Sequence, residues 1–299
     1  MRATALPALA LVLNALIFGI SWWPFRALND LGLHPLWATA LTFILTTLCL
    51  SLVRPGAWRD LVANQQLWWL LAASGLANVG FNWAVTTGDV VRVVLLFYLM
   101  PAWSLLLAWP LLGEKPRVGA VLRLVLALGG VLIVLKTPDT PWPMPVSLPD
   151  WLALLGGLCF ALTNVLLRRL EHTANDARML SMFVGSALMA TTAAWMGQQW
   201  GLVNAMPWPS LNWVGLAIGW GVALMVGNLA LQYGAARLAA STTSLIMLTE
   251  VVFASTSSVL LGAGTLDLRT ALGGSLILAA ALLAAWPTPM ANHHAGQVP

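Results

Sequence analysis

Apolar runs of about twenty residues recur along the whole chain, and this pattern constrains the fold more than any other feature. About twenty consecutive apolar residues are enough for a helix to cross the hydrocarbon core of a bilayer. The strands of a membrane barrel would alternate polar and apolar residues instead. The sequence therefore predicts an all-α polytopic membrane protein.

Ten such runs can be marked along the 299 residues, and short polar or proline-containing segments separate them. Prolines stand where several runs begin, a position at which a helix tolerates the missing N–H. The first run lacks a small-residue cleavage site, so we interpret it as a retained helix and not as a signal peptide. The expected spans are 6–28, 35–53, 67–87, 91–112, 117–136, 150–170, 178–197, 211–233, 240–262 and 269–286.

Charged residues are scarce: they make up 8% of the chain, against about 25% in soluble domains. This scarcity excludes a soluble enzyme, a disordered chain and a nucleic-acid-binding protein. The net charge of +4 is explained by Lys and Arg on cytoplasmic loops. The expected partners are therefore the lipid bilayer and a small-molecule substrate, with no nucleic acid. Cys49 and Cys159 lie inside apolar runs and form no metal motif, so no cofactor is expected.

The distribution of Lys and Arg predicts the orientation of the chain. If the N-terminus lies in the cytoplasm, nine of these residues fall on the cytoplasmic side and four outside, with Arg123 inside a span. This excess follows the positive-inside rule and predicts that both termini are cytoplasmic. The nine are Arg2, Arg54, Arg59, Lys115, Arg117, Arg168, Arg169, Arg178 and Arg237, and the four are Arg26, Arg92, Lys136 and Arg269.

Five prolines fall within residues 137–149 and divide the ten spans into five and five. A proline-rich segment of this kind is typical of a linker. The predicted organisation is a first five-helix repeat at 1–136, a periplasmic linker at 137–149, a second five-helix repeat at 150–286 and a cytoplasmic tail at 287–299.

The two halves carry similar residues in the same order. A Leu-Leu-Gly sequence at 111–113 recurs at 260–262. Because five is an odd number, the second repeat must enter the membrane from the opposite side. Such inverted-topology repeats are typical of secondary transporters, whose binding site lies near the midplane. Further matches are Asn78, Asn82 and Trp83 in the first half with Asn228, Gln232 and Tyr233 in the second, at an offset of 150.

Four short stretches carry a family resemblance: ALIFGISW at 15–22, YLMP at 98–101, LGEKP at 112–116 and LTEV at 248–251. The chain resembles the ten-helix EamA-type exporters of the drug/metabolite transporter superfamily, and within it the bacterial aromatic amino acid exporters. The resemblance implies a ten-helix bundle without an ATPase in the bacterial inner membrane. It also implies a central cavity between helices 1, 3 and 4 of one half and 6, 8 and 9 of the other, with helices 5 and 10 at the periphery.

Of the ten acidic residues, only Glu250 lies near the middle of an expected span. A charged side chain at that depth costs about 2.5–3.5 kcal/mol on insertion scales. One interpretation is a carboxylate that couples transport to protons or binds a substrate amine. The other is a protonated Glu whose hydrogen bond ties two helices together.

Amide and aromatic side chains inside the spans are the other candidates for substrate binding. Amides four residues apart share one helix face and would either line the pathway or bond to neighbouring helices. Aromatic rings would either hold the apolar part of a substrate or pack in the core. The candidates are Trp22, Asn78, Asn82, Trp83, Tyr98, Asn164, Asn228 and Gln232. Pro24, Pro101 and Pro110 are expected to interrupt helices 1 and 4.

These observations predict a secondary transporter that exports small metabolites by alternating access through a central cavity. Amino acids, both aromatic and other neutral ones, are the favoured substrates. The alternatives are an exporter of drugs or other metabolites and a non-transporting receptor or assembly subunit. The sequence contains no HExxH, GxSxG or GxxxxGK[ST] motif, so neither an enzyme nor a primary pump is expected. The expected assembly is a monomer or a homodimer.

Overall fold

The computed structural model describes residues 2–113, 118–136, 144–170, 172–235, 237, 246–247 and 249–285, and the regular structure within these ranges is helical. The helices are α1 (Arg2–Gly19), α2 (Trp22–Asp30), α3 (Pro35–Val53), α4 (Ala57–Ala63), α5 (Gln66–Thr87), α6 (Val90–Phe97), α7 (Met100–Leu112), α8 (Val118–Leu135), α9 (Leu148–Arg169), α10 (Asn175–Gln199), α11 (Leu211–Ala235), α13 (Thr249–Leu260) and α14 (Leu268–Ala285).

Each expected span coincides, in the part that the structure describes, with a helix or a pair of helices. Within the described residues, six helical segments are long and apolar enough to cross a membrane. Two shorter apolar segments, Leu124–Val134 and Leu268–Ala280, lie in α8 and α14. The protein is therefore an all-helical, multi-pass membrane protein, and ten crossings stay a prediction. The six segments are Ala5–Asp30, Pro35–Val53, Val90–Leu112, Leu148–Arg169, Asn175–Gln199 and Leu211–Leu231.

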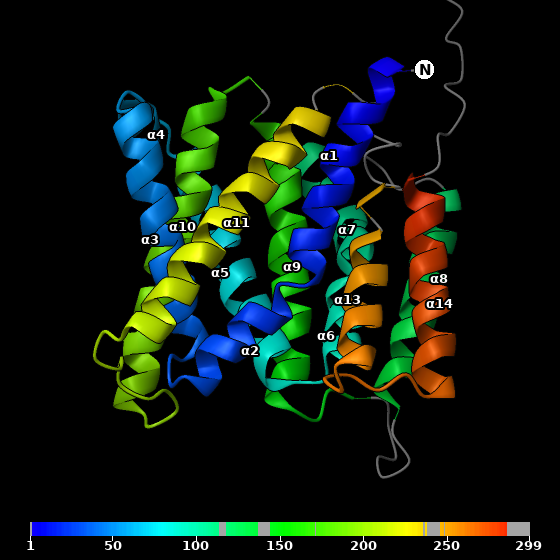
Figure 1. Cartoon of the computed structure of the whole chain (residues 1–299). Coiled ribbons are helices and arrows are strands. Elements are labelled where there is room, and N and C mark those ends of the chain that lie inside the picture. The colour runs from blue at the N-terminus through cyan, green and yellow to red at the C-terminus, as the bar shows by residue number, and fades with distance from the viewer. Residues whose placement is uncertain are drawn as a thin grey trace, which may run out of the picture.

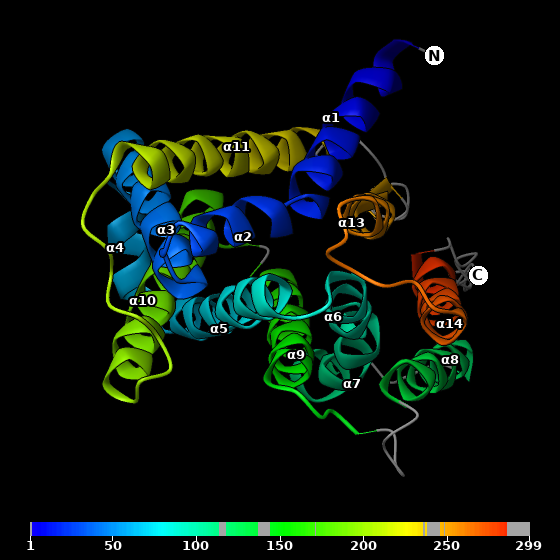
Figure 2. The same ribbon diagram turned by 60° about the horizontal axis from the view of Figure 1, so that its bottom comes forward.

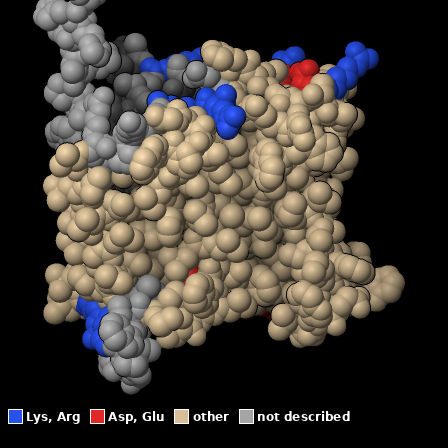
Figure 3. Space-filling view, turned by 180° about the vertical axis from the view of Figure 1, so that it is seen from behind, with Lys and Arg blue, Asp and Glu red and all other residues tan. Residues whose placement is uncertain are grey.

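The outer surface of the bundle is apolar. Figure 3 shows Lys and Arg gathered at the two ends of the molecule, with a wide surface between them that is almost free of charge on that face. Large apolar side chains such as Leu122 and Leu229 are 66% and 58% exposed. A lipid-facing surface has this composition, because hydrocarbon offers nothing to a charged side chain.

Expected helices 1 and 4 are each divided into two helices. The breaks fall between α1 and α2 and between α6 and α7. Each break precedes a proline, Pro24 or Pro101. In a continuous helix a proline ring would clash with the carbonyl four residues earlier. Pro110 lies inside α7, which continues to Leu112. The prediction that Pro110 interrupts this helix is therefore wrong.

The two halves run in opposite directions (Figure 1). Helix α1 descends from the end that carries the N-terminus, whereas α9, the first helix of the second half, ascends toward it. We call this the N-terminal end, and α14 ends there as well. The opposite end, which we call the α2 end, holds α2 and the connections at 31–34, 88–89, 144–147 and 261–267. Which of the two ends faces the cytoplasm stays a prediction.

Contacts between the halves are reciprocal. Helix α5 packs on α9, and its counterpart α11 packs on α1, while α6 and α7 pack on α9 as α13 packs on α1. Helices α8 and α14 pair at the periphery (Figure 2), where the family resemblance placed helices 5 and 10. A Cβ atom on Gly130 would lie 2.5 Å from the Gly273 carbonyl oxygen, and one on Gly273 would lie 2.6 Å from the Gly130 oxygen. Two-fold related repeats produce contacts of this kind.

The expected linker and tail are described only in part. Residues 137–143 and the tail at 287–299 lie outside the described residues, and 144–147 have no regular structure. Helix α9 begins at Leu148, two residues before the predicted start of the second repeat.

Candidate functional site

The break between α6 and α7 places Tyr98 against Glu250. Tyr98 directly follows α6, and its side chain is 4% exposed. Its hydroxyl faces the carboxyl group of Glu250, which is partly buried in the first turn of α13, and the two groups interact electrostatically. Because α6 belongs to the first half and α13 to the second, this contact joins the two halves.

The break between α1 and α2 lies against the same helix. A Cβ atom on Gly19 would lie 2.8 Å from the Glu250 carbonyl oxygen, so the end of α1 touches the backbone of α13. Trp22, the first residue of α2, is 3% exposed and donates its indole N–H to the Ser257 hydroxyl at 3.0 Å. Both broken helices therefore contact α13.

Aromatic rings surround the α6–α7 break. The Phe97 ring lies 4.6 Å from that of Phe81 and 5.4 Å from that of Phe160, between ring centroids. Tyr98 and Trp103 belong to the same apolar cluster. The indole nitrogen of Trp103 is buried and has no hydrogen-bond partner within the described part of the chain. It is thus a free donor next to an otherwise apolar surface.

The amides of α5 act as ties between helices. Asn78 donates to the Ser186 hydroxyl of α10 at 2.9 Å, and Asn82 donates to the Thr39 hydroxyl of α3 at 3.0 Å. The predicted amide pair therefore shares a helix face but bonds to helices other than those that carry Tyr98 and Glu250.

The remaining sequence candidates have separate surroundings. Asn228 donates to the Leu224 carbonyl of its own helix at 3.0 Å. Asn164 is exposed on α9, and the side chain of Gln232 lies outside the described residues. The structure thus brings together Trp22, Tyr98 and Glu250 at one helix, α13, whereas Asn78 and Asn82 bond to α10 and α3.

Trp83 packs at the α2 end and not beside Glu250. Its ring lies 5.3 Å from the His34 imidazole, edge to face. His34 caps α3 by accepting the Leu36 N–H on Nδ1 at 3.2 Å. Burial lowers the pKa of His34 to about 4, because the charged form loses its hydration. This imidazole is therefore neutral at physiological pH.

Sequence reasoning missed Gly19 and Ser257, which hold α13 against the broken helices. Small residues of this kind are common in membrane helices, so neither carries a recognisable signal. It also missed the role of Asp150, for which the sequence does carry a signal. Ser147 and Asp150 stand three residues apart at a helix start, as in a capping box, and the Ser147 hydroxyl accepts the Asp150 N–H at 3.3 Å.

The described residues offer no group of three His, Cys, Asp or Glu side chains that could hold a metal ion. Both cysteines, Cys49 and Cys159, are free thiols. The site is thus built from one carboxyl group, one phenol and surrounding rings.

Comparisons with known proteins identify the family. Residues 5–136 and 147–286 match the EamA-like transporter family. The chain is 36% identical over 93 residues to a Pseudomonas aeruginosa protein described as an uncharacterized transporter, a match that covers 29% of this chain and only 31% of that relative's length. A solved crystal structure has a TM-score of 0.60 at 16% identity, covering 95% of this chain and 97% of the other, which shows a shared fold alone. Because the family match covers most of the chain, this protein belongs to the EamA-like transporter family.

Proposed function

We propose that this transporter exports small metabolites, with aromatic and other neutral amino acids as the favoured substrates, across the bacterial inner membrane by alternating access. The observation that carries the proposal is the close approach of Tyr98 and Glu250, where two broken helices meet α13. Discontinuous helices at the interface of inverted repeats form the binding sites of many secondary transporters.

The depth of the pair supports a site near the midplane. Helix α6 has eight residues between the α2 end and Tyr98, which corresponds to roughly 12 Å at about 1.5 Å per residue. Half of a hydrocarbon core is about 15 Å thick. A carboxyl group at this depth is costly and usually has a function.

The chemistry of the surroundings suits an amphiphilic substrate. The Glu250 carboxylate would accept a substrate ammonium group in a charge-assisted hydrogen bond. The free indole N–H of Trp103 could donate to a substrate carboxylate. The rings around Phe97 would contact an apolar side chain.

A counterflow assay with purified protein in liposomes tests the substrate class. The panel compares phenylalanine, phenethylamine, which lacks the carboxylate, and a lipophilic cationic dye. We expect exchange of phenylalanine and little exchange of the other two. Exchange of the amine and the dye without phenylalanine would favour the drug exporter. Folded protein that exchanges no member of a wider metabolite panel would support a non-transporting membrane subunit.

Glu250→Gln tests the role of the carboxyl group, since the amide keeps its size but cannot exchange a proton. If Glu250 couples transport to protons, the variant keeps exchange and loses accumulation driven by an imposed pH gradient. If Glu250 binds the substrate amine, both affinity and exchange weaken, because a charge-assisted hydrogen bond is about twice as strong as a neutral one.

Asp60→Asn is the matched control, because Asp60 is an exposed acid on α4 that is far from α13 in the fold. It should behave like the parent protein. Normal affinity and a normal gradient response in Glu250→Gln would show that Glu250 is only a tie between helices.

A further inference from the structure

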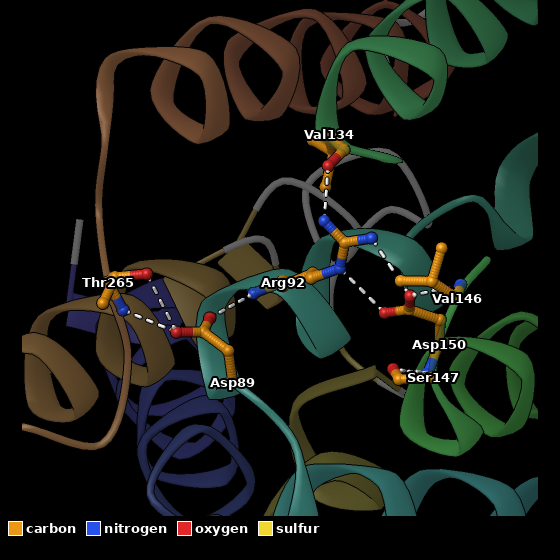
Figure 4. A network of polar contacts seen from close by, with 7 residues as sticks. All are labelled: Asp89, Arg92, Val134, Val146, Ser147, Asp150 and Thr265. Atoms are coloured by element: carbon orange, nitrogen blue, oxygen red, sulfur yellow. Dashed lines mark hydrogen bonds and ion pairs between the residues drawn. The ribbon is translucent and has the colours of Figure 1, made fainter. Parts of the chain in front are cut away.

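A polar network closes the α2 end of the bundle (Figure 4). The Arg92 guanidinium on α6 bonds both carboxylate oxygens of Asp150 on α9, with Nε at 2.8 Å from Oδ1 and Nη2 at 3.0 Å from Oδ2. Its third nitrogen, Nη1, donates to the Val134 carbonyl at the end of α8 at 2.6 Å. The Asp150 side chain is 2% exposed and that of Arg92 is 20% exposed. This is a bidentate ion pair, largely removed from water, between the two halves.

Asp89 makes a second connection between the halves in the same place. One carboxylate oxygen accepts the Arg92 N–H at 2.9 Å and so caps α6. The other accepts the Thr265 N–H at 2.6 Å and the Thr265 hydroxyl at 3.2 Å. Arg26 of α2 donates to the neighbouring Gly88 carbonyl. The start of α6 is therefore fastened to α2, α8 and α9 and to the connection between α13 and α14.

One short helix joins this network to the candidate site. Helix α6 begins directly after Asp89, carries Arg92 in its first turn and ends just before Tyr98. The α6–α7 break leaves this half-helix separate from α7. We expect a helix this short to move as a unit, so that displacement of Tyr98 at the site would also displace Arg92.

The opposite end offers a contrast in the part that the structure describes. Arg54 and Asp176 form an ion pair there at 3.4 Å, but their side chains are 64% and 46% exposed. Such surface pairs contribute little. This pair joins α3 to α10, and neither helix carries Trp22, Tyr98 or Glu250.

We propose that Asp89, Arg92 and Asp150 form a latch that holds the α2 end closed and that must separate before the pathway can open there. The proposal rests on the proposed function, in that the latch serves alternating access. When the latch closes, the charges of Arg92 and Asp150 leave water and compensate each other. Opening returns both to water, so the closed and open arrangements are each satisfied, as a two-state gate requires.

A cysteine introduced at the buried position of Val91 can report whether the latch is open. Val91 is 1% exposed, and its Cγ2 atom would lie 2.9 Å from a Cβ atom on Gly264. If the 261–267 connection separated from α6, the side chain at position 91 would become accessible to water. The assay uses the full chain in liposomes with Cys49→Ala, Cys159→Ala and Val91→Cys, and measures the rate of labelling by a membrane-impermeant maleimide added without substrate.

We expect Asp150→Asn to speed labelling of this thiol by at least about tenfold, because removing one partner of a buried pair leaves the other charge uncompensated. Arg92→Lys keeps the charge but loses the bidentate geometry, so its rate should lie between those of Asp150→Asn and the parent. If Asp150→Asn does not give monodisperse protein, the comparison of Arg92→Lys with the parent tests the latch by itself. Asp267→Asn is the control: it lies at the same end, is exposed, and caps α14 outside the latch.

Equal labelling rates in the latch variants and the parent would overturn the latch. An equal rise in Asp267→Asn would overturn it too, since that would indicate general loosening of this end. The assay needs no transport, so the latch and the proposed function can fail separately. If the parent protein shows no exchange but its variants label as expected, the latch proposal stands and the proposed transport site is wrong.

A covalent lock provides the converse test. Because the Asp89 carboxylate lies 2.6 Å from the Thr265 backbone nitrogen, cysteines at the two positions would lie close together, and a disulfide joins them where their Cα atoms come within about 7 Å. In the pair Asp89→Cys and Thr265→Cys, oxidation should abolish counterflow and a reductant should restore it. Full counterflow by a completely oxidised sample would contradict a gate at this end.

Discussion

Most polar side chains inside the bundle are already hydrogen-bonded within the protein. Ser181 donates to the Leu67 carbonyl at 2.6 Å, and Thr163 to the Cys159 carbonyl at 2.9 Å. Lipid offers no partners, so each polar group in a span must find one inside the protein. Within the described residues, seven side-chain atoms are buried without a hydrogen-bond partner, and they include the indole nitrogens of Trp103 and Trp220 and the Oδ1 atom of Asn14. Of these, only Trp103 shares an apolar cluster with Tyr98.

Asn82 is predicted to be a structural tie. Asn82→Ala should lower the free energy of unfolding by about 0.6 kcal/mol, the average for a hydrogen bond between membrane helices. Thr39→Val should cost a similar amount, and the double variant little more than either alone, because both belong to one bond. Unfolding by SDS, followed through the loss of helicity, measures these free energies. Ser275→Ala, at an exposed position of α14, is the control. Normal stability combined with weakened transport would instead place Asn82 in the pathway.

His34 should make the protein less stable in mild acid. Its pKa is lowered to about 4 in the fold and is about 6.5 in an unfolded chain. Below pH 6.5 the unfolded state binds the proton more readily, so stability is complete above that pH and falls as the pH drops toward 4.

The matched variant for this prediction is His34→Asn, because Asn also caps helices well and does not titrate. Melting temperatures in detergent at pH 7.5 and pH 5 should differ less for His34→Asn than for the parent. Parallel changes in the two proteins would show that His34 protonates freely in the fold.

At the scale of helices, glycine decides how closely the elements approach. Helix α5 packs on α10 through Gly75 and Gly185. A Cβ atom on Gly185 would lie 2.0 Å from the Leu71 carbonyl oxygen, and one on Gly75 would lie 2.4 Å from the Gly185 oxygen. Since these are backbone atoms, a side chain there would force the helices apart.

Gly185→Ala should therefore destabilise the protein, by about 1–3 kcal/mol as for other overpacked positions. Gly215→Ala is the matched control, because a Cβ atom on Gly215 would meet nothing within 4 Å. It should be neutral or stabilising by up to about 1 kcal/mol, the helix preference of Ala over Gly. Size-exclusion profiles and melting temperatures in detergent compare the two variants. Equal stability would mean that α5 and α10 are not in close contact.

At the scale of the whole molecule, the two ends of the bundle are predicted to face opposite sides of the membrane. Ala63 and Ala205 are both exposed. Ala63 is the last residue of α4, at the N-terminal end, and Ala205 lies in the connection from α10 to α11 at the α2 end. In cysteine-free protein, Ala205→Cys should label from the periplasm with an impermeant maleimide, and Ala63→Cys should label only after the cells are permeabilised. The reverse pattern would invert the topology and turn the latch into a cytoplasmic gate.

The positions of the helices could be predicted from the sequence, because a run of apolar residues and its starting proline act locally. The span predicted at 35–53 coincides with α3 (Pro35–Val53). The interruptions near Pro24 and Pro101 were also predictable from the missing N–H and the ring. Pro110 was not a break, because it lies in the last turn of α7, where few backbone hydrogen bonds remain to be lost.

The composition of the candidate site was predictable only in part. Trp22, Tyr98 and Glu250 could be singled out one by one as unusual residues for a membrane span. Their meeting could not be predicted, because Trp22 and its partner Ser257 stand 235 residues apart. The amides Asn78 and Asn82 carried the same signal and bond to other helices.

By itself, the sequence determined that this protein lies in a membrane, where its helices are, where two of them break and that its halves are duplicated. These properties follow from composition and short-range sterics, which act within a few residues. The tertiary structure alone decided which polar groups face one another, as in the pairs Tyr98–Glu250 and Arg92–Asp150. Such pairs depend on the rotation and depth of packed helices, and those are set by the fit of whole surfaces, down to individual glycines such as Gly19 and Gly185.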